Sequence, residues 1–370
     1  MDPITMRSSS FAVFAAMLLT LMLPTGASAA PEALYEGVVG GARVVVALTE
    51  DGGEFFGRYF YRASRLDIDL SGKAEGSAIT LQSRTTGDQL RLKRIGANLT
   101  GVLTTAKARS LPVSLQPAGT PHGLPADVPP GLSLYERWRL AGLRLAPQQA
   151  ETIDGRTIRW YREPLSGIRL FRLETGYPAP AMAAINRELA RNQWQTVSDW
   201  FACTGSDGRP GTEIAEADRP WLGADHMSYA WTASWSCAGN AHPDFATVGH
   251  SYDMRTGGEL HLDDLLRFGS VPVPAEDGDG WYAYRSNSFA PGVVALLKRH
   301  HPQQMAPPGE GAEDECDYAD PEVWNFPAWV LSDKGLWLGA SFPRVQRACD
   351  APEWAIIPWS ALRLPGGERR

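Results

Sequence analysis

The densest group of potentially reactive side chains in this sequence lies between residues 242 and 253. It consists of two histidines and two aspartates, His242, Asp244, His250 and Asp253. Imidazoles and carboxylates bind metal ions and transfer protons when their reactive atoms converge. His250 and Asp253 are an odd number of residues apart, so in a strand they face opposite sides. We therefore expect no metal, no cofactor and no catalytic residue here, and keep the four as candidate ligand-binding residues.

A hydrolase is the alternative for the same segment, with His242 and Asp253 as acid–base residues and Ser236 or Ser251 as a nucleophile. A serine nucleophile needs an oriented base beside it. Neither the G-x-S-x-G elbow nor the H-E-x-x-H zinc motif occurs in the sequence. The sequence therefore favours a protein without catalytic activity.

Tryptophan is abundant, with 13 residues in the chain. Trp231 and Trp235 lie in the segment 227–237 (MSYAWTASWSC), whose strict alternation places both indoles on one face of a strand. Core packing explains most of the tryptophans, because indoles bury large areas. Indoles that stay exposed could stack on sugar rings or anchor a protein partner. Trp231 and Trp235 are therefore further candidate ligand-binding residues.

The sequence contains four cysteines, all between residues 203 and 349. An even number favours disulfides when a chain is exported, as the N-terminal residues described below predict for this one. Of the three possible connectivities we favour Cys203–Cys237 and Cys316–Cys349, since each pair flanks one local unit of structure. Each bond would close a loop of roughly 33 residues and stabilise the fold by about 3–4 kcal/mol. A zinc site is the alternative, but the sequence has no C-x-x-C spacing.

The N-terminus has the features of a secretory signal peptide over residues 1–29. Arg7 precedes the apolar run 11–23, and Ala27-Ser28-Ala29 is a small-x-small cleavage site. No later segment is apolar for long enough to span a bilayer, so we expect no integral membrane segment in the mature chain. The net charge of −7 argues against nucleic acid as a partner. The expected location is the periplasm.

Residues 30–118 are predicted to form a small all-β domain. Seven short strands are separated by glycine-containing turns, which is typical of an antiparallel sandwich or small barrel. The strands are 43–48, 57–61, 66–70, 78–81, 89–92, 99–103 and 111–115. The Pro- and Gly-rich stretch 119–132 then reads as a linker, and residues 133–370 as a second domain.

The second domain is predicted to mix helices and strands. Its strands are 157–162, 168–173, 227–237, 248–254, 259–262, 328–331, 336–342 and 354–357. One helix starts near Pro180 and carries Ile185 and Leu189 on its apolar face. Another begins near Ser288, and Asp263 is a plausible N-cap for a short helix over 264–268. The fold class is therefore α+β: the all-β domain is followed by helices packed on one face of an antiparallel sheet.

Four segments resemble a family of extracytoplasmic domains. They are 241–266 (AHPDFATVGHSYDMRTGGELHLDDLL), 177–189 (YPAPAMAAINREL), 331–336 (LSDKGL) and 357–362 (IPWSAL). The family forms the extracellular part of lysozyme-sensing anti-sigma factors of the RsiV type. It also accompanies some peptidoglycan deacetylases as a non-catalytic domain. The segments follow the family's order and span roughly residues 150–364.

The resemblance implies an extracytoplasmic α+β domain with peptidoglycan or a lysozyme-like protein as the partner, although members of the family differ in partner. The four cysteines are not part of the family pattern, and no deacetylase signature accompanies the domain. We therefore predict an exported, periplasmic, non-catalytic protein that binds a cell-envelope ligand, either a glycan or a wall-degrading protein. An envelope hydrolase and a structural envelope protein are the alternatives.

Overall fold

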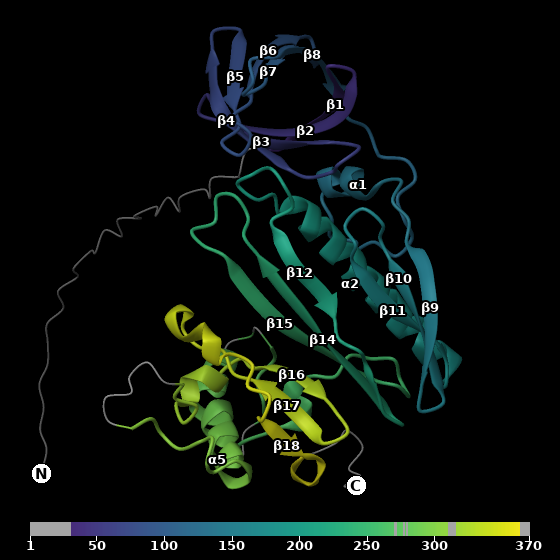
Figure 1. Ribbon diagram of the computed structural model, residues 1–370, viewed down its shortest axis with the longest axis vertical. Coiled ribbons are helices and arrows are strands. Elements are labelled where there is room, and N and C mark those ends of the chain that lie inside the picture. The colour runs from purple at the N-terminus through teal and green to yellow at the C-terminus, as the bar shows by residue number, and fades with distance from the viewer. Residues whose placement is uncertain (1–30, 270–271, 277, 279, 310–315, 363–370) are drawn as a thin grey trace, which may run out of the picture.

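The computed structural model describes residues 31–269, 272–276, 278, 280–309 and 316–362. Figure 1 shows an elongated molecule with a β-barrel at one end, a central body of sheets and a long helix, and a C-terminal lobe at the other end. The signal peptide predicted over residues 1–29 lies outside the described residues. Within the described ranges, no helix combines the length and the apolarity needed to cross a membrane.

The first eight strands form a closed antiparallel barrel, in which each strand pairs with the next and β1 also pairs with β8. They are β1 (Ala33–Val39), β2 (Ala42–Asp51), β3 (Glu54–Tyr61), β4 (Ile68–Glu75), β5 (Ala78–Gln82), β6 (Gln89–Ile95), β7 (Asn98–Thr104) and β8 (Ser110–Pro117). Alternate side chains such as Leu48, Leu81 and Leu92 fill the interior. The prediction of all-β structure in this part of the chain is confirmed, and the strands form a barrel.

Strand β1 is missing from the seven strands that the sequence predicts. Its centre reads Glu36-Gly37, which interrupts the apolar alternation. A Cβ atom at Gly37 would lie 2.0 Å from the carbonyl oxygen of Ser114 on β8. Glycine inside a strand often marks such a close approach. The residue that hides the strand in the sequence is therefore the one that allows the barrel to close.

Helix α1 (Leu134–Leu140) covers part of the outside of the barrel. Ser133 and Glu136 form a capping box, in which each side chain accepts a hydrogen bond from the other residue's backbone N–H. Tyr135 and Trp138 share a core cluster with the outward-facing barrel residues Val45, Ala47 and Phe60. Helix α1 is thus fixed to the barrel by apolar packing.

The central body contains a three-stranded sheet, a long helix and a four-stranded sheet. Its elements are β9 (Ala146–Ile153), β10 (Arg156–Arg162), β11 (Arg169–Thr175), α2 (Ala179–Ala202), β12 (Thr212–Ala217), β13 (Trp221–Leu222), β14 (His226–Trp235) and β15 (Asp244–Asp253). The first sheet has the order β11-β10-β9, and in the second β14 pairs with β12, β13 and β15. Leu189 of α2 shares a core cluster with Phe171 and Tyr229.

A buried ion pair joins the barrel to α1. Asp67, in the connection between β3 and β4, accepts hydrogen bonds from Arg139 Nη2 and from the Tyr135 hydroxyl, both at 2.8 Å. The Arg139 side chain is 1% exposed, and it also donates to the Ser198 carbonyl of α2 at 2.8 Å. A buried charge is costly unless it is paired and hydrogen-bonded, so each part supplies the partner that allows the other part's charge to be buried at this junction.

The backbone of the same aspartate is held by the end of α2. The Asp67 N–H donates to the Phe201 carbonyl at 3.0 Å, and the Asp67 carbonyl accepts from the Thr204 hydroxyl. Asp67 therefore connects the barrel, α1 and the last turn of α2 at one point.

The C-terminal lobe packs against the second sheet of the central body. It comprises α3 (Leu262–Leu265), α4 (Trp281–Tyr284), a π-helical turn (Arg285–Phe289), α5 (Ala290–His300), β16 (Ala328–Leu331), β17 (Gly335–Gly339), β18 (Ile356–Pro358) and three 3₁₀ helices (Pro321–Trp324, Arg344–Cys349, Trp359–Ala361). A Cβ atom at Gly249 would lie 1.7 Å from the Trp329 carbonyl oxygen. Ser228 Oγ accepts from the Leu331 N–H at 3.0 Å. Small residues on β14 and β15 therefore allow the lobe to approach closely.

The predicted strand over 259–262 is wrong. Within that range only Glu259 pairs with the preceding strand, through an isolated bridge to Tyr252. Helix α3 begins already at Leu262, so the chain turns into a helix where the apolar alternation suggested a partner strand.

The predicted N-cap role of Asp263 is also wrong. The N-cap position of α3 is His261, and no side chain caps it. The Asp263 carboxylate lies 3.3 Å from Arg285 Nη2 and accepts from the Trp281 indole at 3.2 Å. Arg285 is buried, and a buried guanidinium needs a counter-ion, so Asp263 serves this long-range partner instead of the helix end.

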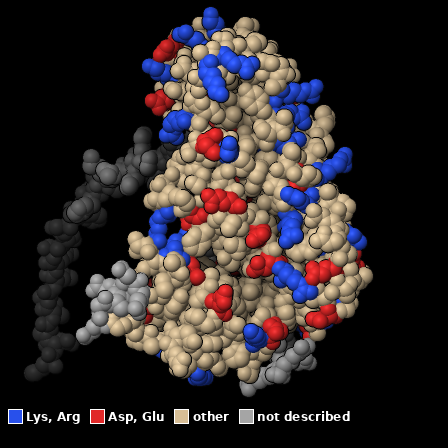
Figure 2. Space-filling model, viewed as in Figure 1, with Lys and Arg blue, Asp and Glu red and all other residues tan. Residues whose placement is uncertain are grey.

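The chain is broadly α+β, and most of its regular structure is strand. Beyond the barrel, the strands of the described residues form three small sheets. The packing of helices on one face of an antiparallel sheet stays a prediction. Figure 2 shows basic side chains gathered on the barrel end of the visible face, with both signs interspersed over the rest.

We predict that Asp67→Ala lowers the free energy of unfolding by about 3–5 kcal/mol, because it leaves Arg139 buried without its counter-ion. Glu75→Ala is the matched control, since the Lys73–Glu75 pair is exposed and such pairs contribute about 0–1 kcal/mol. Denaturant unfolding followed by circular dichroism measures both. If both substitutions lowered the free energy of unfolding by a similar, small amount, the Asp67–Arg139 pair would not be important for the stability of the fold.

Candidate ligand-binding site

The structure distributes the four polar candidates along β15 and the loop before it. His250 lies opposite Tyr229 on β14 and stacks on its ring, with the ring centroids 4.9 Å apart, and His250 Nδ1 is 3.4 Å from Glu259 Oε1. Asp253 holds the turn after the strand: it accepts from the Arg255 backbone N–H at 2.7 Å and from the Arg255 guanidinium at 2.8 Å. These bonds lower the pKa of the Asp253 carboxyl.

His242 and Asp244 lie at the opposite end of the strand. His242 is exposed. Asp244 forms an ion pair with Arg347, which also donates to the Phe245 carbonyl at 2.7 Å. Asp244 and Asp253 are the two ends of β15, and an extended chain of that length covers about 30 Å.

The four residues thus do not meet in one acid–base or metal centre. Proton transfer and metal binding both require the reacting groups within hydrogen-bonding or coordination distance. Within the part of the chain that the structure describes, no group of three or more His, Cys, Asp or Glu side chains is placed to hold a metal ion. The hydrolase alternative with His242 and Asp253 as a pair therefore has no geometric support.

Trp231 and Trp235, in contrast, face a common cleft between α2 and the second sheet. The cleft has a volume of about 390 Å³. Its lining residues are Thr196, Asp199, Trp200, Cys203, Thr212, Ala215, Trp231, Ala233, Trp235 and Cys237. Trp200, Trp231 and Trp235 are all half-buried, so three indoles present part of their surface to the same space. We call this site the indole cleft.

Two periodicities place these side chains together. On α2, Thr196, Asp199, Trp200 and Cys203 follow the i, i+3, i+4, i+7 spacing and lie on one face. On β14 and just after it, Trp231, Ala233, Trp235 and Cys237 follow the two-residue spacing of a strand face. The cleft forms where the end of that helix face crosses that strand face.

A disulfide forms one wall of the indole cleft. Cys203 follows the last turn of α2 and is bonded to Cys237, with the two Cα atoms 4.9 Å apart. The Gly211 N–H donates to the Cys203 carbonyl, and the Ser236 N–H donates to the Gly211 carbonyl, both at 2.7 Å. The covalent bond and these hydrogen bonds fix the end of α2 against the end of β14.

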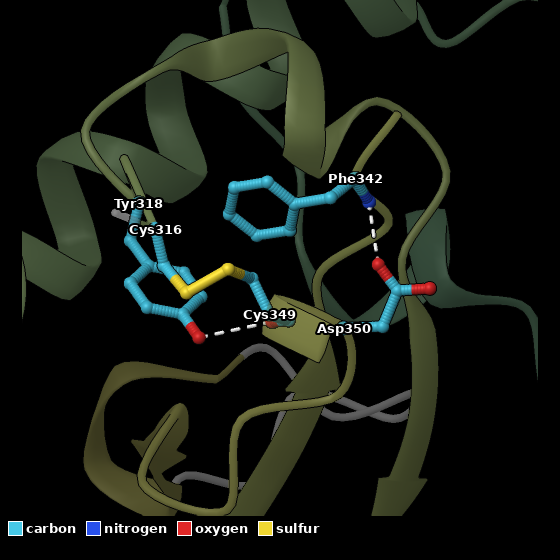
Figure 3. The surroundings of a disulfide bond; sticks show 5 residues. All are labelled: Cys316, Tyr318, Phe342, Cys349 and Asp350. Carbon is cyan, nitrogen blue, oxygen red and sulfur yellow. Dashed lines mark hydrogen bonds between the residues drawn. A yellow bond between two sulfur atoms is a disulfide. The ribbon is translucent and has the colours of Figure 1, made fainter. Parts of the chain in front are cut away.

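The second disulfide stabilises the C-terminal lobe, away from the cleft. Cys316 and Cys349 are bonded with their Cα atoms 5.5 Å apart. Figure 3 shows the Tyr318 hydroxyl donating to the Cys349 carbonyl at 2.9 Å, and the Phe342 N–H donating to Asp350 Oδ1 at 2.7 Å. Both predicted cysteine pairs are confirmed.

The polar groups of the indole cleft are open to a ligand. The indole N–H groups of Trp200, Trp231 and Trp235 have no hydrogen-bond partner among the described residues, whereas the indoles of Trp138 and Trp337 donate to backbone carbonyls at 2.9 Å. Asp199 is exposed in the cleft but is surrounded by protein atoms, and this desolvation raises the pKa of its carboxyl. Among the described residues, Gln195 alone donates to it, at 3.0 Å. Three indoles and one carboxylate therefore line one space, and the carboxylate keeps acceptor capacity beyond its bond to Gln195.

Neither the family models nor the curated proteins with which the chain was compared match it. The resemblance to the RsiV-type domains therefore remains an expectation from the four sequence segments.

We predict that the double substitution Cys203→Ser/Cys237→Ser lowers the free energy of unfolding by about 3–4 kcal/mol, as expected for a loop of this length. Hydrogen exchange should accelerate in the last turn of α2 and in residues 203–211, because the bond ties them to β14. Cys316→Ser/Cys349→Ser is the control: its loop is nearly as long, with a sequence separation of 33 against 34. The control should accelerate exchange only in the C-terminal lobe. If the two double variants gave the same exchange pattern, the Cys203–Cys237 bond would not be what holds the end of α2 against the end of β14.

Proposed function

We propose that the protein is an exported, non-catalytic binding protein that recognises a glycan of the cell envelope in the indole cleft. The observation that carries the proposal is the convergence of Trp200, Trp231 and Trp235 beside Asp199 in a cleft of about 390 Å³. Small-molecule sites are concave, mostly apolar, about 300–1,000 Å³ in volume, and contain a few polar groups that orient the ligand.

The chemistry of the cleft suits a sugar better than other small ligands. A sugar ring has an apolar face of C–H groups, which can lie flat on an indole, and hydroxyl groups around its edge. The free indole N–H groups can donate to ring or hydroxyl oxygens, and the Asp199 carboxylate can accept from hydroxyls. A protein partner such as a lysozyme would need a broader surface, since stable interfaces bury about 800 Å² on each side.

The proposal also includes the compartment. Two disulfides in one chain fit an oxidising environment, and the signal peptide proposed over residues 1–29 would deliver the chain to the periplasm. In the same proposal residues 133–370 form an RsiV-like domain in which helices lie on one face of an antiparallel sheet. The ligand would then be a peptidoglycan strand or a fragment of it.

The direct test is binding to purified peptidoglycan sacculi by co-sedimentation and to a chitin-type tetrasaccharide by titration calorimetry. We predict that Trp231→Ala and Trp235→Ala each weaken binding more than tenfold, the loss expected when a central aromatic anchor is removed. Phe56→Ala is the control, because Phe56 is an exposed aromatic on the barrel, and it should bind like the natural chain. Retention of lysozyme in place of either glycan would assign the site to a protein partner.

The pH dependence of binding supplies a second prediction. Desolvation raises the pKa of Asp199 above its ordinary value, and the ionised carboxylate is a stronger acceptor of hydroxyl donors than the protonated form. Affinity should therefore fall as the pH is lowered from about 7 to about 4, where a carboxyl with a raised pKa takes up its proton. Asp199→Asn keeps the shape but does not titrate, so its affinity should be lower and constant over this range. A natural chain with no pH dependence would exclude Asp199 from the site.

A further inference from the structure

A second cavity opens at one end of the barrel, separate from the indole cleft. Its volume is about 410 Å³. It is lined by Pro31, Ala33, Tyr35, Leu48, Glu50, Gly52, Phe55, Ile79, Arg94 and Leu99. Tyr35, Leu48, Phe55, Ile79 and Leu99 also belong to the buried cluster inside the barrel. The cavity therefore lies at one end of the side-chain-filled barrel, and the outermost apolar residues of the barrel core form part of its wall.

An ion pair spans the mouth of this cavity. Arg94 Nη2 on β6 lies 3.7 Å from Glu50 Oε2 on β2. In the closed order of the barrel, β2 and β6 are separated by three strands in either direction, so the two residues come from opposite walls and meet across the opening.

Both charged residues continue the interior-facing alternation of their strands. Glu50 follows Val46 and Leu48 on β2, and Arg94 follows Leu90 and Leu92 on β6 at two-residue spacing; the four apolar residues are in the barrel core. Charges at interior positions are unfavourable unless they serve a polar partner. Here they lie at the rim, where each side chain is about half exposed, so they border the cavity without being buried in it.

The wall of the cavity holds an unused hydrogen-bonding group. Tyr35 is 8% exposed, and its hydroxyl has no hydrogen-bond partner among the described residues. The hydroxyl oxygen is not among the buried polar atoms that lack a partner, so it is accessible although the residue is mostly covered. Tyr35 and Arg94 both line the cavity, so a ligand there could supply that partner.

We propose that this cavity binds one small amphiphile with a carboxylate head, whose apolar body packs on the apolar lining at the end of the barrel while the head takes Arg94 from Glu50 and accepts from Tyr35. A guanidinium forms two parallel hydrogen bonds with a carboxylate. Exposed ion pairs are weak, so Glu50 is easily displaced into water. An anion is favoured over a cation because residues 31–117 contain 11 Lys and Arg against 9 Asp and Glu, although the whole chain has a net charge of −7. This site is independent of the proposed glycan site.

The test uses decanoate, with decylamine and decanol as probes of the same chain length and different charge. Binding to the full chain is measured by titration calorimetry below the micelle concentration of each probe. Decanoate should bind best. Arg94→Gln should weaken decanoate binding at least tenfold and leave decanol unchanged, whereas Glu50→Gln should strengthen decanoate binding several-fold because it removes the competing carboxylate.

Two further variants separate the cavity from the rim. Ile79→Trp fills the cavity and should abolish binding of all three probes, with thermal unfolding used to confirm that the barrel remains folded. Trp231→Ala removes an indole from the other site and should leave decanoate binding unchanged. The proposal is overturned if decanoate does not bind at millimolar concentration, if Arg94→Gln binds it as the natural chain does, or if decylamine binds more tightly than decanoate.

Discussion

The ion pair between Asp67 and Arg139 determines how the parts of this molecule are arranged. The carboxylate belongs to the barrel and the guanidinium to α1, and each is almost completely buried. Because an unpaired buried charge is strongly unfavourable, the docked arrangement of the barrel and α1 requires both members of the pair. The Asp67 backbone is bound at the same time by Phe201 and Thr204, so the end of α2 is fixed to the same point. That end of α2 carries Trp200, which forms one side of the indole cleft.

Strand β14 supplies the other side of the cleft and also the contact with the C-terminal lobe, because its two faces differ. The face with Trp231 and Trp235 is aromatic and lies toward α2. The opposite face carries Ser228 and, on the paired strand, Gly249, which are small enough for β16 to approach closely. A larger residue in place of Ser228 or Gly249 would push the C-terminal lobe away. A smaller residue in place of Trp231 or Trp235 would remove part of the aromatic wall of the cleft. The alternation of side chains along β14 therefore determines both the cleft against α2 and the contact with the C-terminal lobe.

Much of this architecture can be predicted from local sequence patterns. The barrel strands, α2, β14 and both disulfides follow from alternation, helical periodicity and cysteine spacing. Strand β1 is hidden by Gly37, since the requirement for a glycine comes from the neighbouring strand β8 and not from β1 itself. Asp263 looks like a helix cap because nothing near it in the sequence reveals the buried Arg285 that it neutralises.

The candidate sites show the same division between local and long-range information. Trp231 and Trp235 can be recognised from the strand pattern, but Trp200 needs the crossing of α2 over β14. The predicted Cys203–Cys237 bond places the end of α2 beside the end of β14. Trp200 lies three residues before Cys203, so this bond could have predicted that Trp200 lies near Trp235. Proximity in sequence did not predict proximity in space for His242, Asp244, His250 and Asp253. An extended strand holds its two ends far apart, and these residues lie along β15 and in the loop before it. Glu50 and Arg94 meet only because a barrel closes.

The central claim is that three indoles from two different elements form one glycan site. The most direct measurement is a crystal structure of the chain grown with a soluble disaccharide-peptide fragment of peptidoglycan at saturating concentration. The account predicts that a sugar ring lies on Trp231 or Trp235, with a hydroxyl within hydrogen-bonding distance of Asp199. A fragment bound elsewhere on the molecule, or an indole cleft that stays filled with water alone, would contradict it.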